Sequence, residues 1–315
     1  MKNIKIIEVP SEISAGTRGA SLGVEAIKIA ALDFMSNFFV HFPSEKVETE
    51  NHLLFEPVAS PYAKRINGLI TMYERVSKAV EDTIKNNFFP VVLSGDHGTS
   101  GGTIAGIKAA KPKSRLGVVW IDAHADLHTP YTTPSGNMHG MPLAASIGEN
   151  NEECMAHKLD EKSKKQWDQL KGSAKSSPRI LPEDIVFIGL RDFEKEEKHL
   201  IDKYDMKVIT ASELRRKGAE SVVRSSMRYL SECTDIYVSF DVDCLDSSLS
   251  RGTGTPVSNG IKEREAEDLI SKFMQNRKIC CFEITEVNPT LDRENLMAEI
   301  AFNILQRSVN VLMMN

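Results

Sequence analysis

Residues 116–128, LGVVWIDAHADLH, decide the fold of this chain. The first six residues, 116–121, form an apolar run that is typical of a strand buried on both faces. The run passes directly into Asp122, His124 and Asp126, which prefer water or a polar partner. A strand of this kind belongs to a parallel sheet covered by helices, and polar residues directly after it belong at the carboxyl edge of that sheet.

Further apolar segments repeat this character and alternate with helical patterns. The other predicted strands are 4–9, 88–94, 184–190, 207–210, 235–240 and 278–284. The predicted helices include 63–87, 211–231, 262–276 and 293–309. Strands that alternate with helices along the chain indicate an α/β protein with a parallel sheet buried on both faces.

Length and composition favour a single domain over residues 1–315. A chain of 315 residues fits one large α/β domain or two smaller ones. The segment 148–177 is polar and rich in lysine, and it breaks the alternation of strands and helices. We interpret this segment as a surface excursion with at most one exposed helix, and not as a second domain.

Charge and cysteine content exclude several classes of partner. The net charge of −5 and the pI near 6.0 offer no basic surface for nucleic acid or for an anionic membrane. The five cysteines form no CxxC pair, which favours a reduced, cytoplasmic protein. The stretch MKNIKIIEVP (1–10) has no long apolar h-region, and the sequence has no uninterrupted apolar run of transmembrane length. We therefore expect a small-molecule partner, with no nucleic acid and no membrane.

Polar residues follow four of the predicted strands at the point where each strand ends. Ligands of open parallel sheets bind outside the carboxyl ends of the strands, so these side chains are expected to converge. The converging residues are His97, Asp122, His124, Asp126, Asp241, Asp243 and Glu286.

Four aspartates in one crevice that is partly shielded from water need positive charge to balance them. Desolvation and mutual repulsion both raise the pKa of such carboxyls, and two divalent cations would balance four carboxylates. Oxygen-rich ligation with two imidazoles suits manganese better than a structural zinc site, which relies on cysteine. Two ions about 3.5–4 Å apart can share a water and lower its pKa, so these strand ends predict a binuclear metal site.

Simpler explanations exist for each motif alone. Asp-x-His and Asp-x-Asp are common at strand ends, where they cap helices or form turns. Asp96 and His97 precede a Gly-rich segment, but the lysine of a phosphate-binding loop is missing. Cys244 is adjacent to Asp243, and we interpret it as a buried structural thiol and not as a nucleophile. Only the joint pattern on four strands favours metal binding.

The motifs together resemble those of the arginase-like ureohydrolases, binuclear manganese enzymes that hydrolyse guanidino and related C–N bonds. The resemblance implies a three-layer αβα sandwich around a central, mostly parallel sheet of about eight strands. The loop 128–140, HTPYTTPSGNMHG, is similar to the substrate loop of arginases proper. The motifs are GTRGASLGV (16–24), SGDHG (94–98), DAHAD (122–126), SFDVDCLD (239–246), GTGTPVSNG (252–260) and EITEVNP (283–289).

The resemblance assigns a metal-binding role to six residues. It implies two Mn²⁺ per subunit, although Co²⁺ and Fe²⁺ accept the same ligands. Asp122 and Asp241 would bridge the two ions. The first ion would be held by His97, Asp122, Asp126 and Asp241, and the second by His124, Asp122, Asp241 and Asp243.

The resemblance also implies the reaction: hydrolysis of L-arginine to L-ornithine and urea by a hydroxide that bridges the two ions. Asp126 would orient the hydroxide, His139 would shuttle a proton, and Glu286 would pair with the guanidinium. Thr255 would lie near the same part of the substrate. The amino-acid end would meet His128, Ser135, Asn137 and Glu194. By resemblance the protein would be a homo-oligomer, a trimer or a hexamer.

Two residues depart from the arginase pattern in the region of the amino-acid end. His128 stands where an asparagine is expected, and Glu194 stands where an aspartate is expected. These changes leave open a related ureohydrolase acting on agmatine, guanidinobutyrate or formimidoylglutamate. A third alternative is a non-catalytic, metal-stabilised oligomer that serves as a binding protein.

Overall fold

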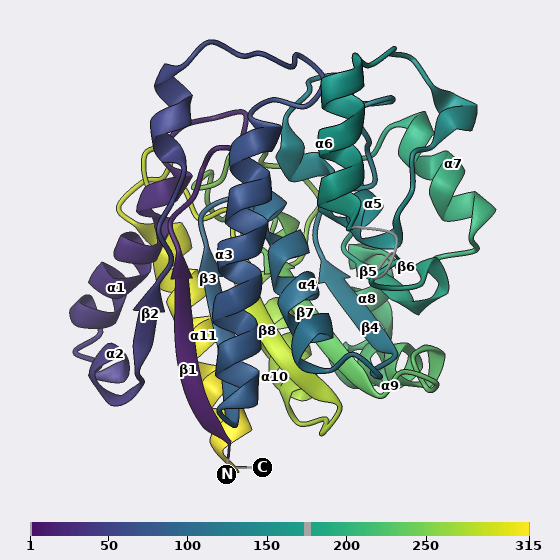
Figure 1. Ribbon diagram of the computed structural model, residues 1–315. Coiled ribbons are helices and arrows are strands. Elements are labelled where there is room, and N and C mark those ends of the chain that lie inside the picture. The colour runs from purple at the N-terminus through teal and green to yellow at the C-terminus, as the bar shows by residue number, and fades with distance from the viewer. Residues whose placement is uncertain (1, 173–177, 315) are drawn as a thin grey trace.

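The computed structural model describes residues 2–172 and 178–314. Its centre is one sheet in the order β2-β1-β3-β8-β7-β4-β5-β6, and every pairing in it is parallel. The predicted parallel sheet of about eight strands is therefore confirmed (Figure 1). The strands are β1 Asn3–Val9, β2 Ser44–Lys46, β3 Phe88–Ser94, β4 Leu116–Ile121, β5 Ile185–Ile188, β6 Lys207–Ile209, β7 Asp235–Asp241 and β8 Ile279–Thr285.

Helices cover both faces of the sheet, and the apolar core divides accordingly. In β4, Val119 and Ile121 face one helical layer, whereas Val118 and Trp120 face the other. This alternation is the period of two expected of a strand buried on both sides. One layer contains α1 Gly23–Asp33, α2 Phe38–His41, α8 Ala211–Lys217, α9 Ala219–Tyr229, α10 Glu263–Met274 and α11 Leu296–Met314. The other contains α3 Ile66–Lys85, α4 Ser100–Ala110, α5 Pro142–Ile147, α6 Glu161–Lys171 and α7 Lys195–Lys203.

Two details of the predicted elements were wrong. The edge strand β2 was missed because its three residues, Ser-Glu-Lys, are polar and exposed, as is usual for short edge strands. The predicted helix 211–231 is two helices, α8 and α9, because Gly218 between them has a φ of +76°. That left-handed conformation suits glycine and interrupts the helical hydrogen bonds.

The segment 148–177 does contain a helix, but that helix is not merely exposed. In α6, Trp167 and Leu170 are buried in the core cluster that also contains α3 and α5 residues. The indole Nε1 of Trp167 donates to Asn150 Oδ1 over 3.1 Å. The helix is therefore exposed on one side only, because this polar segment also contributes one large aromatic side chain to the core. Residues 173–177 lie outside the described part of the chain.

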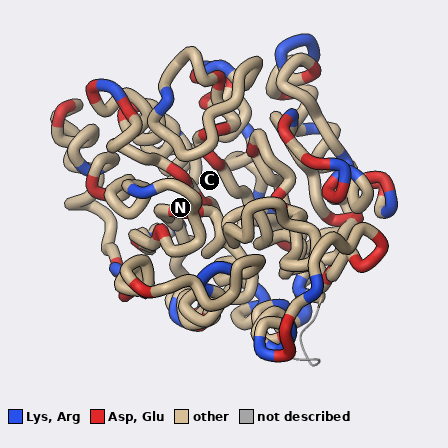
Figure 2. Tube along the Cα trace, turned by 90° about the horizontal axis from the view of Figure 1, so that it is seen from above, with Lys and Arg blue, Asp and Glu red and all other residues tan. Residues whose placement is uncertain are grey.

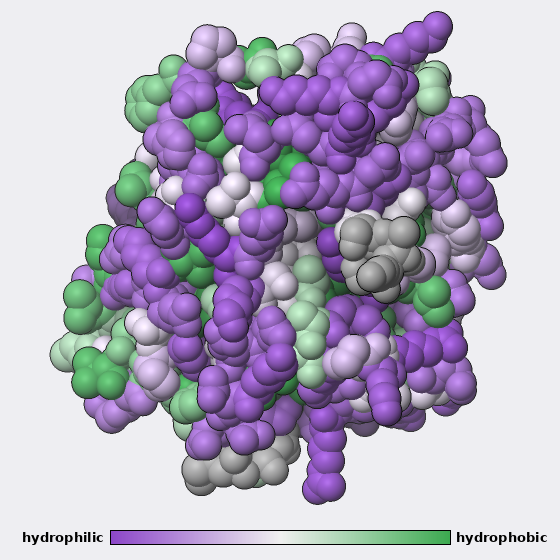
Figure 3. Space-filling view, in the orientation of Figure 1, coloured by the Kyte–Doolittle hydropathy of each residue, from purple (hydrophilic) through white to green (hydrophobic). Residues whose placement is uncertain are grey.

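The surface carries interspersed acidic and basic residues (Figure 2). Exposed apolar side chains gather around α1 and α2, at the left of the space-filling view (Figure 3). Leu32, Met35 and Val40 are the most exposed among them. Within residues 2–172 and 178–314, the helices are all too short or too polar to cross a membrane.

Candidate active site

The sheet order brings four strand ends together. Strands β3, β8, β7 and β4 are consecutive neighbours, although they lie far apart in the sequence. Each strand passes into polar residues at its carboxyl end, and the short 3-10 turns that follow β3 and β7 carry His97 and Asp243. The side chains that the sequence predicted to converge therefore lie on one edge of the sheet.

A first cluster surrounds His97. Its Nδ1 atom lies 3.0 Å from Asp122 Oδ2, 3.2 Å from Asp126 Oδ2 and 3.2 Å from Asp241 Oδ2. All four side chains are buried. One nitrogen and three carboxylate oxygens thus converge on a single point.

A second cluster surrounds His124 and shares Asp122 with the first. The Nδ1 atom of His124 lies 2.9 Å from Asp243 Oδ2 and 3.5 Å from Asp122 Oδ1. The two oxygens of Asp122 therefore face different histidines. Sharing of one carboxylate by two clusters is the arrangement needed for a bridging ligand.

The donor atoms of these clusters fit metal ions. In the described part of the chain, His97 Nδ1, Asp122 Oδ2 and Asp126 Oδ2 are buried without a hydrogen-bond partner. Native proteins rarely leave such atoms unsatisfied, and a bound cation would satisfy all three. The charge of four buried carboxylates points the same way, because two divalent cations would neutralise it.

The pKa shifts of the clustered residues show how unfavourable it is to gather these carboxylates. Burial and the neighbouring Asp122 raise the pKa of Asp126 to about 6. Burial, together with Asp243 and Asp122, raises the pKa of Asp241 well above its ordinary value. Burial opposes protonation of His97, but its three aspartate neighbours outweigh burial and raise its pKa. Divalent cations would relieve the repulsion that raises the pKa of these carboxyls.

Surrounding groups hold the clustered side chains in place. His97 Nε2 lies 2.8 Å from Ser239 Oγ, and the imidazole stacks on Trp120 with ring centroids 4.0 Å apart. Thr255 Oγ1 donates to Asp243 Oδ2 over 2.9 Å. Contacts of this kind orient metal ligands, and they leave Nδ1 of His97 facing the aspartates.

His139 and Glu286 lie beside the first cluster. His139 Nδ1 is 3.3 Å from Glu286 Oε1, which also accepts from the backbone N–H of His97 over 2.9 Å. Burial raises the pKa of the Glu286 carboxyl, but its contacts with His139 and His97 outweigh this effect and lower it. Glu286 has a φ of +66° and Asp126 a φ of +52°, so two site residues occupy the left-handed region that non-glycine residues rarely adopt.

A pocket of about 120 Å³ is lined by residues of both clusters and by residues of two neighbouring segments. Its outer part is formed by the loop 128–140 and by residues at the start of α7. All the substrate-contacting residues expected from the sequence line this pocket except Glu286. The lining residues are His97, His124, Asp126, His128, Thr133, Pro134, Ser135, Asn137, His139, Gly140, Glu194, Glu197, Asp241, Asp243 and Thr255.

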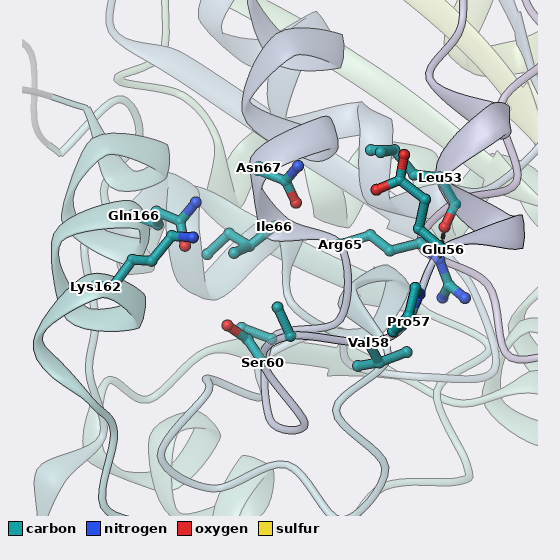
Figure 4. A pocket seen from close by; sticks show the side chains of 12 residues that line it. Leu53, Glu56, Pro57, Val58, Ser60, Arg65, Ile66, Asn67, Lys162 and Gln166 are labelled. Atoms are coloured by element: carbon teal, nitrogen blue, oxygen red, sulfur yellow. Dashed lines mark hydrogen bonds between the residues drawn. The ribbon is translucent and has the colours of Figure 1, made fainter.

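A second hollow, of about 230 Å³, lies between the loop 53–60, the start of α3 and α6 (Figure 4). It shares no lining residue with the first pocket. Arg65 and Lys162 are its basic side chains. None of the predicted site residues lines it, so we do not assign it to the active site.

Three residues near the site were missed by the sequence-based predictions. Lys64 Nζ donates to Asn137 Oδ1 over 3.1 Å, and Glu197 lines the pocket. Arg191 donates to backbone carbonyls on both sides of the site, including Asp243 O at 2.9 Å. Glu197 follows Glu194 by three residues, a capping-box spacing that could have marked it. Lys64 and Arg191 carried no local signal, since their contacts are with distant segments.

An open parallel sheet with two His–Asp clusters and a pocket at its carboxyl edge defines the class of α/β metal-dependent hydrolases. The Arginase family model matches residues 2–309. The chain is 35% identical to the arginase of Brevibacillus brevis and 34% identical to that of Bacillus subtilis, over 96% and 97% of both chains in each pair. The crystal structure of Bacillus subtilis arginase superposes with a TM-score of 0.79 at 33% identity, covering 98% of each chain.

The chain therefore belongs to the arginase family. Members of this family are amidinohydrolases with a binuclear metal centre, and this protein is accordingly an enzyme of that type. The resemblance inferred from the sequence motifs is thereby confirmed.

Proposed function

We propose that the protein hydrolyses L-arginine to L-ornithine and urea. The observation that carries this proposal is the pair of His–Asp clusters that share Asp122, with Glu286 beside them. The 35% identity to an arginase over nearly the whole chain supports the same substrate. A guanidinium is resonance-stabilised and a poor electrophile, so its hydrolysis needs a strong nucleophile at neutral pH.

Two divalent cations, Mn²⁺ in this proposal with Co²⁺ or Fe²⁺ as alternatives, would occupy the two clusters. When bound, they would lower the pKa of a water and neutralise charge that develops on the substrate. His97, Asp122, Asp126 and Asp241 would hold one ion. His124, Asp243 and the two shared carboxylates would hold the other.

The protein's own residues bind and orient the guanidinium. Glu286 is buried beside the first cluster and presents a carboxylate to the flat guanidinium, which favours paired hydrogen bonds. Thr255 orients Asp243 through its hydroxyl and lines the pocket. The left-handed backbone at Glu286 directs this side chain back toward His97.

Two residues act on the nucleophile and on the leaving group through hydrogen bonding and proton transfer. Asp126, whose Oδ2 atom is buried at the first cluster, accepts a hydrogen bond from the attacking water and orients it. His139, whose Nδ1 atom lies 3.3 Å from Glu286 Oε1, donates a proton to the leaving amine nitrogen. Burial opposes its protonation, but Glu286 outweighs burial and raises the pKa of His139, which favours the proton-donating form.

The outer pocket contacts the amino-acid end of the substrate. Ser135, Asn137, Glu194 and His128 all line this part of the pocket, and the first two offer hydrogen-bond donors. Because His128 and Glu194 depart from the arginase pattern, agmatine, guanidinobutyrate and formimidoylglutamate are the competing substrates.

The test is product release by manganese-loaded protein supplied with each of these four compounds. We expect urea from L-arginine with the highest kcat/KM, and we expect Asp122→Asn to abolish it. Asp202→Asn, a matched change on the exposed face of α7, should leave the rate unchanged. Preference for another compound would reassign the substrate, whereas metal binding without turnover of any compound would leave only a non-catalytic role.

We further propose a homo-oligomer, a trimer or a hexamer. The exposed apolar side chains Leu32, Met35 and Val40 support association of copies through the α1–α2 region. Light scattering after size-exclusion chromatography measures the mass directly. A mass near 35 kDa would contradict association.

A further inference from the structure

His128 and Glu194 contact each other at the outer end of the pocket. His128 Nε2 lies 3.0 Å from Glu194 Oε2, and His128 Nδ1 lies 3.2 Å from Thr132 Oγ1. A carboxylate only accepts hydrogen bonds, so the Nε2–H of His128 donates to Glu194. The donor of this imidazole is therefore engaged before any substrate arrives, and its other nitrogen faces a hydroxyl.

Glu197 holds the backbone beside Glu194. Its Oε2 atom accepts from the backbone N–H of Glu194 over 3.2 Å. Glu197 Oε1 accepts from Leu127 N over 3.0 Å. Glu197 thus holds the backbone around the pocket, whereas Glu194 is held by His128. An ammonium group of a substrate would have to share or displace these contacts.

The outer pocket is also lined by hydrogen-bond donors. Lys64 Nζ donates to Asn137 Oδ1, so the amide Nδ2 supplies the donors of that side chain. Ser135 Oγ accepts from Asn137 N over 3.2 Å, so its O–H can donate elsewhere. A carboxylate is the substrate group that two such donors and a nearby lysine recognise.

We infer that the outer pocket selects its substrate by a carboxylate and not by an adjacent ammonium, and that His128 is the residue that determines this specificity. The substrate class is that of ω-guanidino carboxylates of arginine's length, with or without an α-amino group. This inference rests on the proposed hydrolysis of a guanidino compound. His128 acts by holding Glu194, which would otherwise be free to bind an ammonium.

The experiment compares three substrates of manganese-loaded protein. They are L-arginine, 5-guanidinopentanoate, which lacks the α-amino group, and agmatine, which lacks the carboxylate. A site that makes no hydrogen bond to a group discriminates little against its absence, so kcat/KM for 5-guanidinopentanoate should be within about tenfold of that for arginine. For agmatine it should fall by about a hundredfold, the value of a lost charged hydrogen bond.

The variant His128→Asn releases Glu194. We expect the ratio of kcat/KM for arginine to that for 5-guanidinopentanoate to rise by about tenfold, because the arginine ammonium gains a carboxylate. The matched control is His199→Asn, which breaks a His–Glu pair with Glu153 on the outer surface of α7. This control should leave all three values unchanged.

The outcomes separate the inference from the proposed function. Urea release from arginine with a loss of about a hundredfold or more for 5-guanidinopentanoate would overturn the inference and leave the function standing. If His128→Asn lowered kcat/KM equally for all three compounds, His128 would be structural and its role in specificity would be wrong. Absence of urea from all three would overturn the proposed function and this inference with it.

Discussion

Replacement of Arg191 by lysine tests whether one side chain holds the site loops together. The Arg191 guanidinium contacts six backbone carbonyls with its five N–H groups, one of which is shared between two acceptors, and it joins the segment after β5 to the loops that follow β7. The acceptors are the carbonyls of Gly189, Asp243, Cys244, Leu245, Val257 and Ser258, at 2.9–3.2 Å. Lysine keeps the charge but has only three donor protons, so at least half of these carbonyls lose their partner.

The structure sets the expected size of the effect. At about 1–1.5 kcal/mol for each of three carbonyls left without its hydrogen bond, Arg191→Lys should lower the free energy of unfolding by about 3–5 kcal/mol. The entropy of unfolding for a chain of 315 residues is roughly 0.66 kcal/mol/K at about 2.1 cal/mol/K per residue. The melting temperature should therefore fall by about 6 °C. Metal affinity should fall as well, because Asp243 belongs to the second cluster.

Thermal and urea unfolding, each measured with and without Mn²⁺, provide the assay. The metal content of purified protein, determined by mass spectrometry, gives the second observable. Arg224→Lys is the matched control, since Arg224 makes only an exposed pair with Glu220 on α9. We expect the control to change stability by less than about 0.5 kcal/mol. A loss below about 1 kcal/mol for Arg191→Lys would refute the reasoning, because the carbonyl contacts would then contribute no more than water does.

Three further predictions concern metal, proton transfer and pH. Removal of metal by a chelator should lower the melting temperature. Mn²⁺ at about 100 times its dissociation constant should restore about 2.7 kcal/mol of folding stability per site. If calorimetry finds no change, the clusters hold no metal. His139→Asn should slow turnover by about 10²–10⁴-fold with the metal content unchanged, and loss of manganese in this variant would make His139 a ligand instead of a shuttle. Burial raises the pKa of Glu197 from 4.5 to about 8. The folded state holds this proton more tightly than the unfolded state, so the free energy of unfolding falls as the pH rises from 4.5 to about 8. Urea unfolding between pH 5 and pH 8 should show a smaller decline for Glu197→Gln than for the parent protein, and equal declines would contradict the shift.

Much of the site could be predicted because its residues follow their strands directly. Asp122 and His124 come after the apolar run 116–121, and Asp241 ends the run 235–240, so the local pattern alone assigns them to a sheet edge. The same pattern predicted the parallel sheet, since a strand buried on both faces needs helices above and below. The short polar strand β2 and the break at Gly218 were missed because their local patterns are those of loops and of continuous helix.

The sequence by itself determined the class of fold, the edge on which the site lies and the types of group that converge there, because these follow from local periodicity and from residues adjacent in the chain. The tertiary structure alone decided that Asp122 is shared between His97 and His124, that His128 holds Glu194, and that Arg191 joins three loops. Each of these contacts joins segments that come close only when strands pair in the order observed. Packing, and not local preference, sets that order.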